Sequence, residues 1–379
     1  MIGEGRVNRK KKLPFALDRN DGRSLVAQLV DGFREAILGG YYAPGDVLPS
    51  YRDLAPALGV SQIVTKAALK LLANEGLIVS RPRIGSVVRD SGEKRWLGNV
   101  VFVYPESDLS YFQTVFAEEV RSRLAAAGYL MTQVRVGPKS ENGYDLSLLD
   151  AALARSVDLA VVLYDRPQIF RRLASRKVPF VAVGQGASAP RGSVGFSRLD
   201  YNLAVPDFAA ECKALAAKCV VEFCWDPIMC DATPILRASG VPAAKTLVKP
   251  DMSRGQLFGV ERAGRLAFER LIAQGKVSRD AVYFFADDYL ARGALTALAN
   301  AGMKTPEDVR IATWANAGLG PDYSRELSRM EMDPVRAGAT IAKAVLSYLK
   351  NGTYPDGIVI GPKWIAGETL TIKHIRATY

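Results

Sequence analysis

The chain has 379 residues, 49% of them hydrophobic, so it is too long for one typical domain and apolar enough to form well-packed cores. Its formal net charge is +11, and residues 1–95 hold 16 of the 50 basic and 10 of the 39 acidic residues. Net positive charge per residue is therefore more than three times higher in this N-terminal part, which suits a polyanionic partner there.

The N-terminal residues argue against export and against membrane insertion. A basic run at residues 9–12 is not followed by the apolar segment of a secretory signal. No stretch of the chain approaches the roughly 18 consecutive apolar residues of a transmembrane helix. We therefore expect a cytoplasmic protein with no membrane partner, which begins with a disordered basic tail over residues 1–13.

Residues 14–90 predict a small domain of helices followed by a hairpin. Residues 24–39 have apolar side chains every three or four positions, which predicts an amphipathic helix that ends at a pair of glycines. Ser50 is placed to cap a short helix that ends at Leu58, and Ser61 to cap a second one. Helix, helix-turn-helix and a basic hairpin together make a winged helix.

The helix that Ser61 caps has one apolar and one mixed face. The i, i+3, i+4, i+7 pattern predicts that one set of side chains is buried: Thr65, Ala68, Leu69 and Leu72. The opposite set should face solvent: Gln62, Ile63, Lys66, Ala67 and Lys70. After it, residues 77–80 and 86–88 predict two strands joined by a basic loop.

The stretch GDVLPSYRDLAPALGVSQIVTKAALKLLANEGLI, residues 45–78, resembles the GntR family of bacterial transcription regulators. The resemblance implies that this domain binds a double-stranded DNA operator through its second helix and its wing. By position in the family pattern, the residues expected at the DNA are Ser50, Arg52, Ser61, Gln62, Ile63, Val64, Lys66, Arg81, Arg83 and Gly85.

Two of these positions depart from the family pattern. Gln62 and Lys66 stand where the family usually has arginines, which pair with guanine. A Gln amide suits adenine, and the neighbouring apolar side chains suit thymine methyl groups. The departures leave an alternative open, in which the domain is a degenerate head that no longer binds DNA.

Residues 98–379 predict a larger α/β body after a polar linker at residues 91–97. Apolar runs typical of buried parallel strands alternate with helical segments, at 99–104, 130–134, 159–164, 180–184, 219–224, 282–286 and 310–314. Repeated βαβ units imply doubly wound layers, and their number favours two Rossmann-like lobes over one. The fold class is therefore an α/β body with an N-terminal α+β winged helix.

Three segments of this body resemble the effector domain of LacI-type repressors and of type I periplasmic sugar-binding proteins. They are VPFVAVG at 178–184, ADDYLARGALTAL at 286–298 and NAGMKTPEDVRI at 300–311. A GntR head on such a body is similar to the arabinose repressors. The resemblance implies a homodimer whose DNA binding is modulated by a small molecule, a sugar or sugar derivative being one candidate, held between the lobes.

The effector site expected from this resemblance takes residues from several strand ends. They are Tyr111, Phe112, Asp165, Gln185, Asp200, Asp287, Trp314 and Asn316. Asp287 replaces an Asn of the family, and Trp314 and Asn316 lie in a segment that has lost one of its carboxylates. The helix around Arg237 also looks shorter than the one that binds sugar hydroxyls in the family.

The sequence gives little support for a metal site, a bound cofactor or a catalytic site. Cys212, Cys219, Cys224 and Cys230 form no C-x-x-C pair, and His374 is the only histidine. The adjacent carboxylates Asp287 and Asp288 fit helix capping better than acid/base catalysis. No cofactor-lysine segment appears, as the aminotransferase-like bodies fused to some GntR heads would require.

The sequence thus predicts a non-enzymatic, sequence-specific DNA-binding transcription regulator that responds to a small molecule, with no metal and no cofactor. The alternative is a cytoplasmic solute-binding sensor with a degenerate DNA-binding head. A solute-binding protein without any regulatory role is disfavoured by the attached head.

Overall fold

The computed structural model describes residues 13–19, 21–82, 84–89, 96–105, 110–140, 143–225 and 230–371. The chain divides into two compact units. The first comprises residues 1–100 with 124–132 and 156–158, and the second comprises the rest. No helix in the described ranges is both long and apolar enough to cross a membrane. The expected tail at residues 1–13 and linker at 91–97 fall almost entirely outside these ranges.

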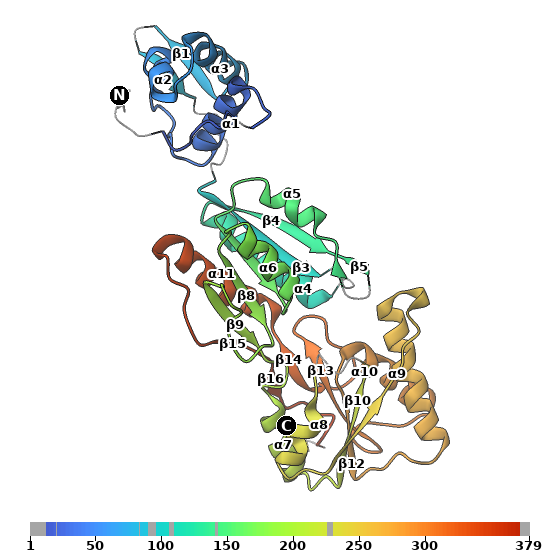
Figure 1. Cartoon of the computed structure of the whole chain (residues 1–379). Helices are drawn as coiled ribbons and strands as arrows, with labels where there is room; N and C mark the ends of the chain where they lie inside the picture. Colours follow the sequence, from blue (N-terminus) through green and yellow to red (C-terminus); the bar gives the residue numbers. More distant parts are fainter. Residues whose placement is uncertain are drawn as a thin grey trace, which may run out of the picture. The chain divides into compact units, whose positions relative to one another are not determined.

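The N-terminal head is a winged helix built of three helices and a hairpin (Figure 1). Its elements are α1 Leu25–Leu38, α2 Tyr51–Leu58, α3 Gln62–Asn74, β1 Ile78–Arg81 and β2 Gly85–Val88. The two strands pair antiparallel, with Ile78 opposite Val88 and Arg81 opposite Gly85. The helices and the hairpin predicted from the sequence are therefore confirmed.

The core of the head is formed by the apolar stripes of its helices. Phe33 and Leu29 of α1 are fully buried, and the ring of Phe15 packs edge-on against Phe33 at 5.1 Å between centroids. On α3 the buried residues are Thr65, Ala68, Leu69 and Leu72, as the sequence pattern predicts. This burial fixes which face of α3 is left to solvent.

One lobe of the body has a six-stranded sheet in the order β15-β9-β8-β7-β3-β4, and we call it the N-lobe. Its strands are β3 Gly98–Pro105, β4 Tyr129–Val136, β7 Leu159–Leu163, β8 Phe180–Gly184, β9 Gly195–Leu199 and β15 Ile358–Ile360. Its helices are α4 Tyr111–Ala126, α5 Ser147–Leu153, α6 Pro167–Ser175 and α11 Pro334–Asn351. A small hairpin of β5 Pro138–Ser140 and β6 Gly143–Tyr144 stands apart from the sheet.

The other lobe, the C-lobe, has a sheet in the order β11-β10-β12-β13-β14-β16 (Figure 1). Its strands are β10 Cys219–Cys224, β11 Ala243–Leu247, β12 Ala281–Phe285, β13 Arg310–Asn316, β14 Ser328–Met332 and β16 Lys363–Ile365. Its helices are α7 Val205–Ala214, α8 Ala232–Ala238, the 3₁₀ turn η1 Met252–Arg254, α9 Gln256–Ala273 and α10 Asp288–Asn300. All strand pairs are parallel except β14 with β16.

The chain passes between the two lobes three times. It leaves the N-lobe sheet after β9 to enter α7, returns after β14 to form α11, and crosses again between β15 and β16. Two of these crossings are joined directly, because the backbone N–H of Asp200 donates to the carbonyl of Ile360 at 2.7 Å. The predicted fold class, two parallel α/β lobes behind a winged helix, is confirmed.

Candidate functional site

The turn between α2 and α3 is fixed by capping and by one left-handed residue. The hydroxyl of Ser50 accepts a hydrogen bond from the backbone N–H of Asp53 at 3.2 Å, and that of Ser61 accepts one from Val64 at 3.4 Å. Gly59 has φ of +64°, a region that favours glycine. The Thr65 hydroxyl donates to the carbonyl of Tyr51 at 3.0 Å, which ties α3 to α2.

This geometry places the expected DNA-reading side chains in solvent. Gln62, Ile63 and Lys66 are exposed at the start of α3, and Val64 is half-buried. The Ile63 side chain is 80% exposed, the largest value among the exposed bulky apolar residues of the described chain. An apolar side chain in water at a helix start fits contact with a partner such as a thymine methyl group.

The basic residues of the head fall into paired and unpaired groups. Arg23 forms ion pairs with Asp21 and Asp31, and Arg34 pairs with Glu75 at 2.6 Å. In the part of the chain that the structure describes, other exposed basic side chains have no ion-pair partner: Arg52, Lys66, Lys70 and Arg81. These four charges belong to α2, α3 and the hairpin, where a phosphate backbone could neutralise them, while the side chain of Arg19 donates to the carbonyl of Gly59.

The wing is partly described. Arg81 is exposed at the end of β1, and Gly85 opens β2 with φ of +114°, a conformation that a side chain at this position would strain. Arg83, the third expected residue of the wing, lies outside the described residues. Arg52 lies on α2, where its Nε donates to the Tyr51 hydroxyl at 3.2 Å.

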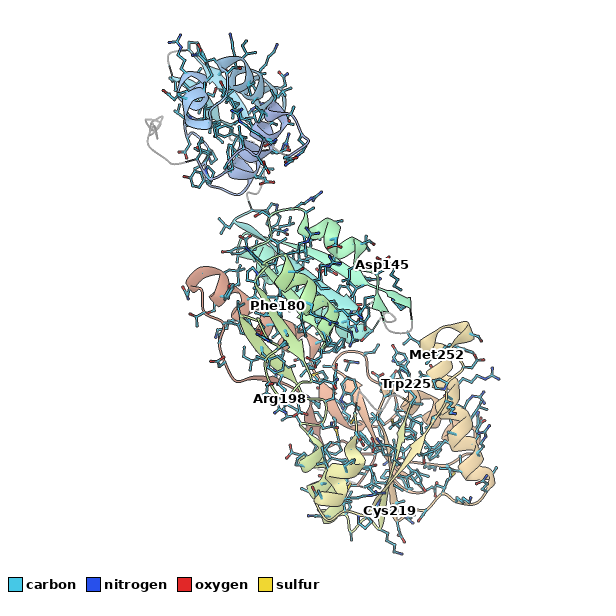
Figure 2. The ribbon with its side chains drawn as sticks, in the orientation of Figure 1. Asp145, Phe180, Arg198, Cys219, Trp225 and Met252 are labelled. Carbon is cyan, nitrogen blue, oxygen red and sulfur yellow. The ribbon has the colours of Figure 1, made fainter. Side chains whose placement is uncertain are left out.

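In the C-lobe, Asp287 caps the helix that follows β12. One carboxylate oxygen accepts from the backbone N–H groups of Tyr289 and Leu290 at 2.8 and 3.3 Å. The other accepts from the indole N–H of Trp225 at 3.1 Å. Trp225 follows the last residue of β10, at the end opposite Cys219 (Figure 2). The capping role expected for this aspartate is confirmed, and the cap also links β10 to β12.

Asp288, the next residue, is 2% exposed. Burial raises the pKa of its carboxyl to about 7, and the negative charge of the neighbouring Asp287 adds to the effect. The backbone N–H of Asn316 donates to one of its oxygens at 3.5 Å, so Asp288 connects α10 to the end of β13. A buried carboxyl that titrates near neutrality marks this place as a candidate functional site.

The end of β13 holds buried polar atoms without partners. Trp314 is 3% exposed and Asn316 8% exposed. Within the described chain, neither the indole N–H of Trp314 nor the side-chain oxygen of Asn316 has a hydrogen-bond partner, and the same holds for Nε of Arg292 on α10. Leaving such groups unpaired costs about 1–3 kcal/mol each, so a bound polar ligand is the natural source of their partners.

Aromatic residues connect this end of β13 to the N-lobe. Tyr201, which follows β9, lies edge-on to Trp314 with 5.9 Å between ring centroids. Its hydroxyl donates to that of Tyr164 at 3.3 Å, just after β7. Tyr164 has a strained φ of +68°, as residues at functional sites often do. Tyr111 at the start of α4 also reaches the C-lobe, donating to the carbonyl of Ala317 at 3.3 Å.

The remaining expected effector residues make contacts within their own part of the body. Asp165 accepts from the backbone N–H groups of Gln185 and Gly186, both at 2.9 Å, and so joins the ends of β7 and β8. Phe112 is 3% exposed and stacks on Phe116 with 5.5 Å between centroids. Gln185 is exposed.

Asp200 lies at a crossing between the lobes, and both of its carboxylate oxygens are engaged. One pairs with Arg198 at 2.7 Å, and the other accepts from the backbone N–H of Asn202 at 3.0 Å. Among the described residues, no group of three or more His, Cys, Asp or Glu could hold a metal ion. His374 lies outside those residues.

The structure also brings in residues that the sequence analysis did not select. Tyr164, Tyr201, Trp225 and Arg292 surround the expected positions through the contacts above. Three of them directly follow or nearly follow a strand, so the rule that ligands bind at strand carboxyl ends could have found them. Arg292 follows Asp288 by one helical turn, a spacing that places both on one face of α10.

Two family models match separate parts of the chain. The model described as bacterial regulatory proteins, gntR family, matches residues 25–88. The model described as a periplasmic binding protein-like domain matches residues 234–370. The chain therefore joins a GntR-type helix-turn-helix segment to a periplasmic-binding-protein-like body.

Curated relatives match less than a quarter of the chain in the two comparisons that follow. The HTH-type transcriptional regulator YieP of Escherichia coli is 28% identical over 93 residues, which is 24% of this chain and 40% of the relative. An HTH-type transcriptional regulator of Mycobacterium tuberculosis is 48% identical over 70 residues, 18% of this chain and 29% of the relative. The chain thus spans less than half the length of either relative.

Solved structures match the fold of the body. A LacI family transcriptional regulator from Arthrobacter sp. FB24, in complex with lactose, has a TM-score of 0.57 and 16% identity, covering 72% of this chain and 100% of that one. The transcriptional regulator CelR with cellobiose has a TM-score of 0.55 and 16% identity, covering 92% and 99%. The body therefore has the LacI-type fold.

The raised pKa of Asp288 predicts a pH dependence of stability. Because the folded state holds this proton more tightly than the unfolded state, ionisation of Asp288 destabilises the fold as pH rises from about 4 to about 7. In Asp288→Asn this loss should be absent, and the difference in unfolding free energy between pH 5 and pH 8 should shrink by on the order of 1–4 kcal/mol. Urea unfolding at both pH values measures it. The exposed Asp322→Asn is the control, and an equal pH slope in wild type and Asp288→Asn would contradict the prediction.

Proposed function

We propose that this protein is a sequence-specific DNA-binding transcription regulator whose affinity for its operator is set by a small molecule bound between the lobes of its body. The observation that carries the proposal is the exposed face of α3, with unpaired basic side chains on α2, α3 and the hairpin around it. This face lies on a segment that matches the GntR family model.

The buried polar atoms at β13 support a hydroxyl-rich effector. Trp314 and Arg292 offer donors there, and Asn316 offers an acceptor. A hydroxyl group both donates and accepts, so a sugar or sugar derivative can satisfy all three. Two proteins of similar fold bind lactose and cellobiose, which agrees with this ligand class.

The proposed mechanism is a shift between lobe arrangements. A ligand with contacts on both sides of the crevice favours a closed arrangement, and closure pivots on the three crossings of the chain. We propose a cytoplasmic homodimer, in which lobe closure changes the spacing of two heads on a pseudo-palindromic site. The protein needs no catalytic residue for this role.

The start of α3 generates the first test. Gln62 should prefer adenine, and Gln62→Arg should redirect that position of the half-site to guanine, with a change of about 1–3 kcal/mol in discrimination. Selection of binding sites from random DNA, for wild type and variant side by side, measures it. Lys350→Gln, on α11, is the control outside the head.

Two results would contradict this part of the proposal. If wild type selects no sequence, the head is degenerate and the protein is a solute sensor. If Gln62→Arg selects the same half-site as wild type, the start of α3 does not read bases, and affinity comes from phosphate contacts alone.

Two arginines of the head, one without an ion-pair partner and one with a partner, provide a variant and its matched control. Arg81→Gln removes an unpaired charge, so binding should weaken alike on all sequences, and the slope of log K against log salt should fall by roughly 0.9. Arg23→Gln removes an exposed charge that is already paired with Asp21, and the slope should stay nearly unchanged. Fluorescence anisotropy over a salt series measures both. Equal effects of the two variants would mean that the hairpin is not at the DNA.

The unpaired indole N–H of Trp314 tests the effector site. Trp314→Phe keeps a ring but removes this donor, so the unfolding free energy should change by less than about 1.5 kcal/mol. The affinity for whichever saccharide binds wild type in a thermal-shift panel should fall about ten-fold by calorimetry. Trp364→Phe removes an equally buried and unpaired N–H on β16 and is the control. Unchanged affinity in Trp314→Phe would place the effector elsewhere.

A further inference from the structure

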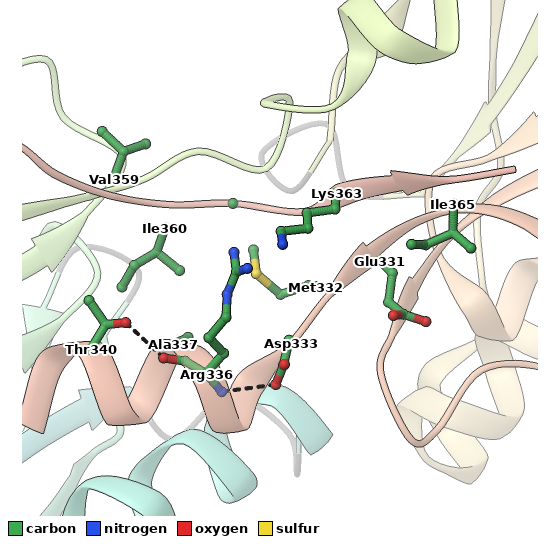
Figure 3. A pocket seen from close by; sticks show the side chains of 11 residues that line it. Glu331, Met332, Asp333, Arg336, Ala337, Thr340, Val359, Ile360, Lys363 and Ile365 are labelled. Atoms are coloured by element: carbon green, nitrogen blue, oxygen red, sulfur yellow. Dashed lines mark hydrogen bonds between the residues drawn. The ribbon is translucent and has the colours of Figure 1, made fainter. Parts of the chain in front are cut away.

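A cavity lies beside the chain crossings, and its lining residue Met332 is the sheet partner of Asn316 at the end of β13. It has a volume of about 290 Å³ and lies between the start of α11 and residues 359–365 (Figure 3). None of the expected effector residues lines it. Its charged lining residues are Arg336 at the start of α11, Lys363 at the start of β16, and the carboxylates Glu331 and Asp333.

The two basic side chains of this cavity have no counter-charge of their own. The Arg336 side chain extends from α11 toward that of Lys363 (Figure 3). Among the described residues, no carboxylate forms an ion pair with either of them. Glu331 is already paired with Arg329 at 2.6 Å, and Asp333 caps α11 by accepting from the backbone N–H of Arg336 at 2.9 Å.

Two facing cations repel each other unless an anion lies between them. Arginine presents a planar set of donors that matches a phosphate, and lysine adds a point charge. The lining also has an apolar part, in which Met332, Ala337 and Ile360 are buried beside the charged groups. The cavity therefore suits a molecule with one doubly charged oxyanion group and a small carbon body.

We propose that this cavity binds a small organic phosphate, with its phosphate group between Arg336 and Lys363. The volume lies near the lower end for small-molecule sites, which limits the ligand to a few carbon atoms beyond the phosphate. This is a second site, and it stands whether or not the site at β13 binds a sugar.

The position of the two cations gives the ligand a regulatory role. Arg336 belongs to α11, which packs on α4 of the N-lobe so closely that a Cβ at Gly338 would lie 2.8 Å from the carbonyl of Phe116. Lys363 belongs to β16, which pairs with β14 in the sheet of the C-lobe. A phosphate bound by both side chains joins the two lobes, and it favours the lobe arrangement in which they are close together.

The test is calorimetric titration of the purified full chain with glycerol 3-phosphate at constant ionic strength, with inorganic phosphate and glycerol as separate arms. Glycerol 3-phosphate should bind saturably with a Kd on the order of 1 mM or tighter, inorganic phosphate more weakly, and glycerol not at all. In Arg336→Gln/Lys363→Gln the affinity should fall at least about ten-fold, since two charge-assisted contacts are lost.

The control variant is Lys343→Gln/Lys350→Gln, which removes the same charge from exposed positions farther along α11 and should bind as wild type does. Thermal unfolding without ligand shows that both double variants are folded. The proposal is overturned if wild type gives no saturable heat up to about 10 mM glycerol 3-phosphate, well above the expected Kd. It is equally overturned if both double variants bind alike, or if inorganic phosphate binds more tightly than glycerol 3-phosphate. No DNA or sugar enters this experiment, so its failure is separate from failure of the proposed function.

Discussion

The close approach of two of the three chain crossings is the constraint on which the body depends. The backbone N–H of Asp200 donates to Ile360, and a Cβ at Gly361 would lie only 2.5 Å from the carbonyl of Asp200. A larger residue than glycine at this place would force the crossings apart. Because they are held together, the lobes can change their arrangement only by small changes at these segments, as in hinge motions of two-lobed proteins. A ligand bound to polar groups near the crossings, such as Arg336 and Lys363, therefore shifts the equilibrium between lobe arrangements.

The elements that could be predicted from sequence are those whose burial leaves a periodic pattern. The stripe of α3 predicts its buried face, and unbroken apolar runs predict β7, β8 and β12. The strands β9, β14 and β16 beside the crossings were not predicted, because each is only three to five residues long, mixes polar with apolar side chains, and is defined by its neighbours. The order of strands in each sheet, and with it the number of crossings, depends on these same elements.

In the candidate site, too, some features could be predicted from the sequence and others could not. Sequence resemblance selects positions at strand ends, and the structure finds Asp287 capping a helix and Asp165 joining two strands. Both carboxylates are thus engaged by backbone N–H groups; the cap at Asp287 was predicted from the sequence, whereas the link that Asp165 makes between two strands depends on three-dimensional neighbours. Trp314, Asn316 and Arg292 differ from them in having buried atoms without partners among the described residues. Unpaired burial, which only coordinates reveal, identifies groups that need a hydrogen-bond partner from ordered water or from a ligand.

The same reasoning applies to charge in both halves of the protein. In the head, Arg23 and Arg34 are neutralised by neighbouring carboxylates, while Lys66 and Arg81 are not. An exposed ion pair contributes little to stability, so the paired arginines need no partner outside the chain. An unpaired charge that faces another of the same sign, as Arg336 faces Lys363, raises the energy of the empty protein and lowers it when an anion binds. Net charge indicates only that a polyanion is a suitable partner for the head. The pattern of ion pairs shows which basic residues of the head, on α3 and the hairpin, are left for that partner.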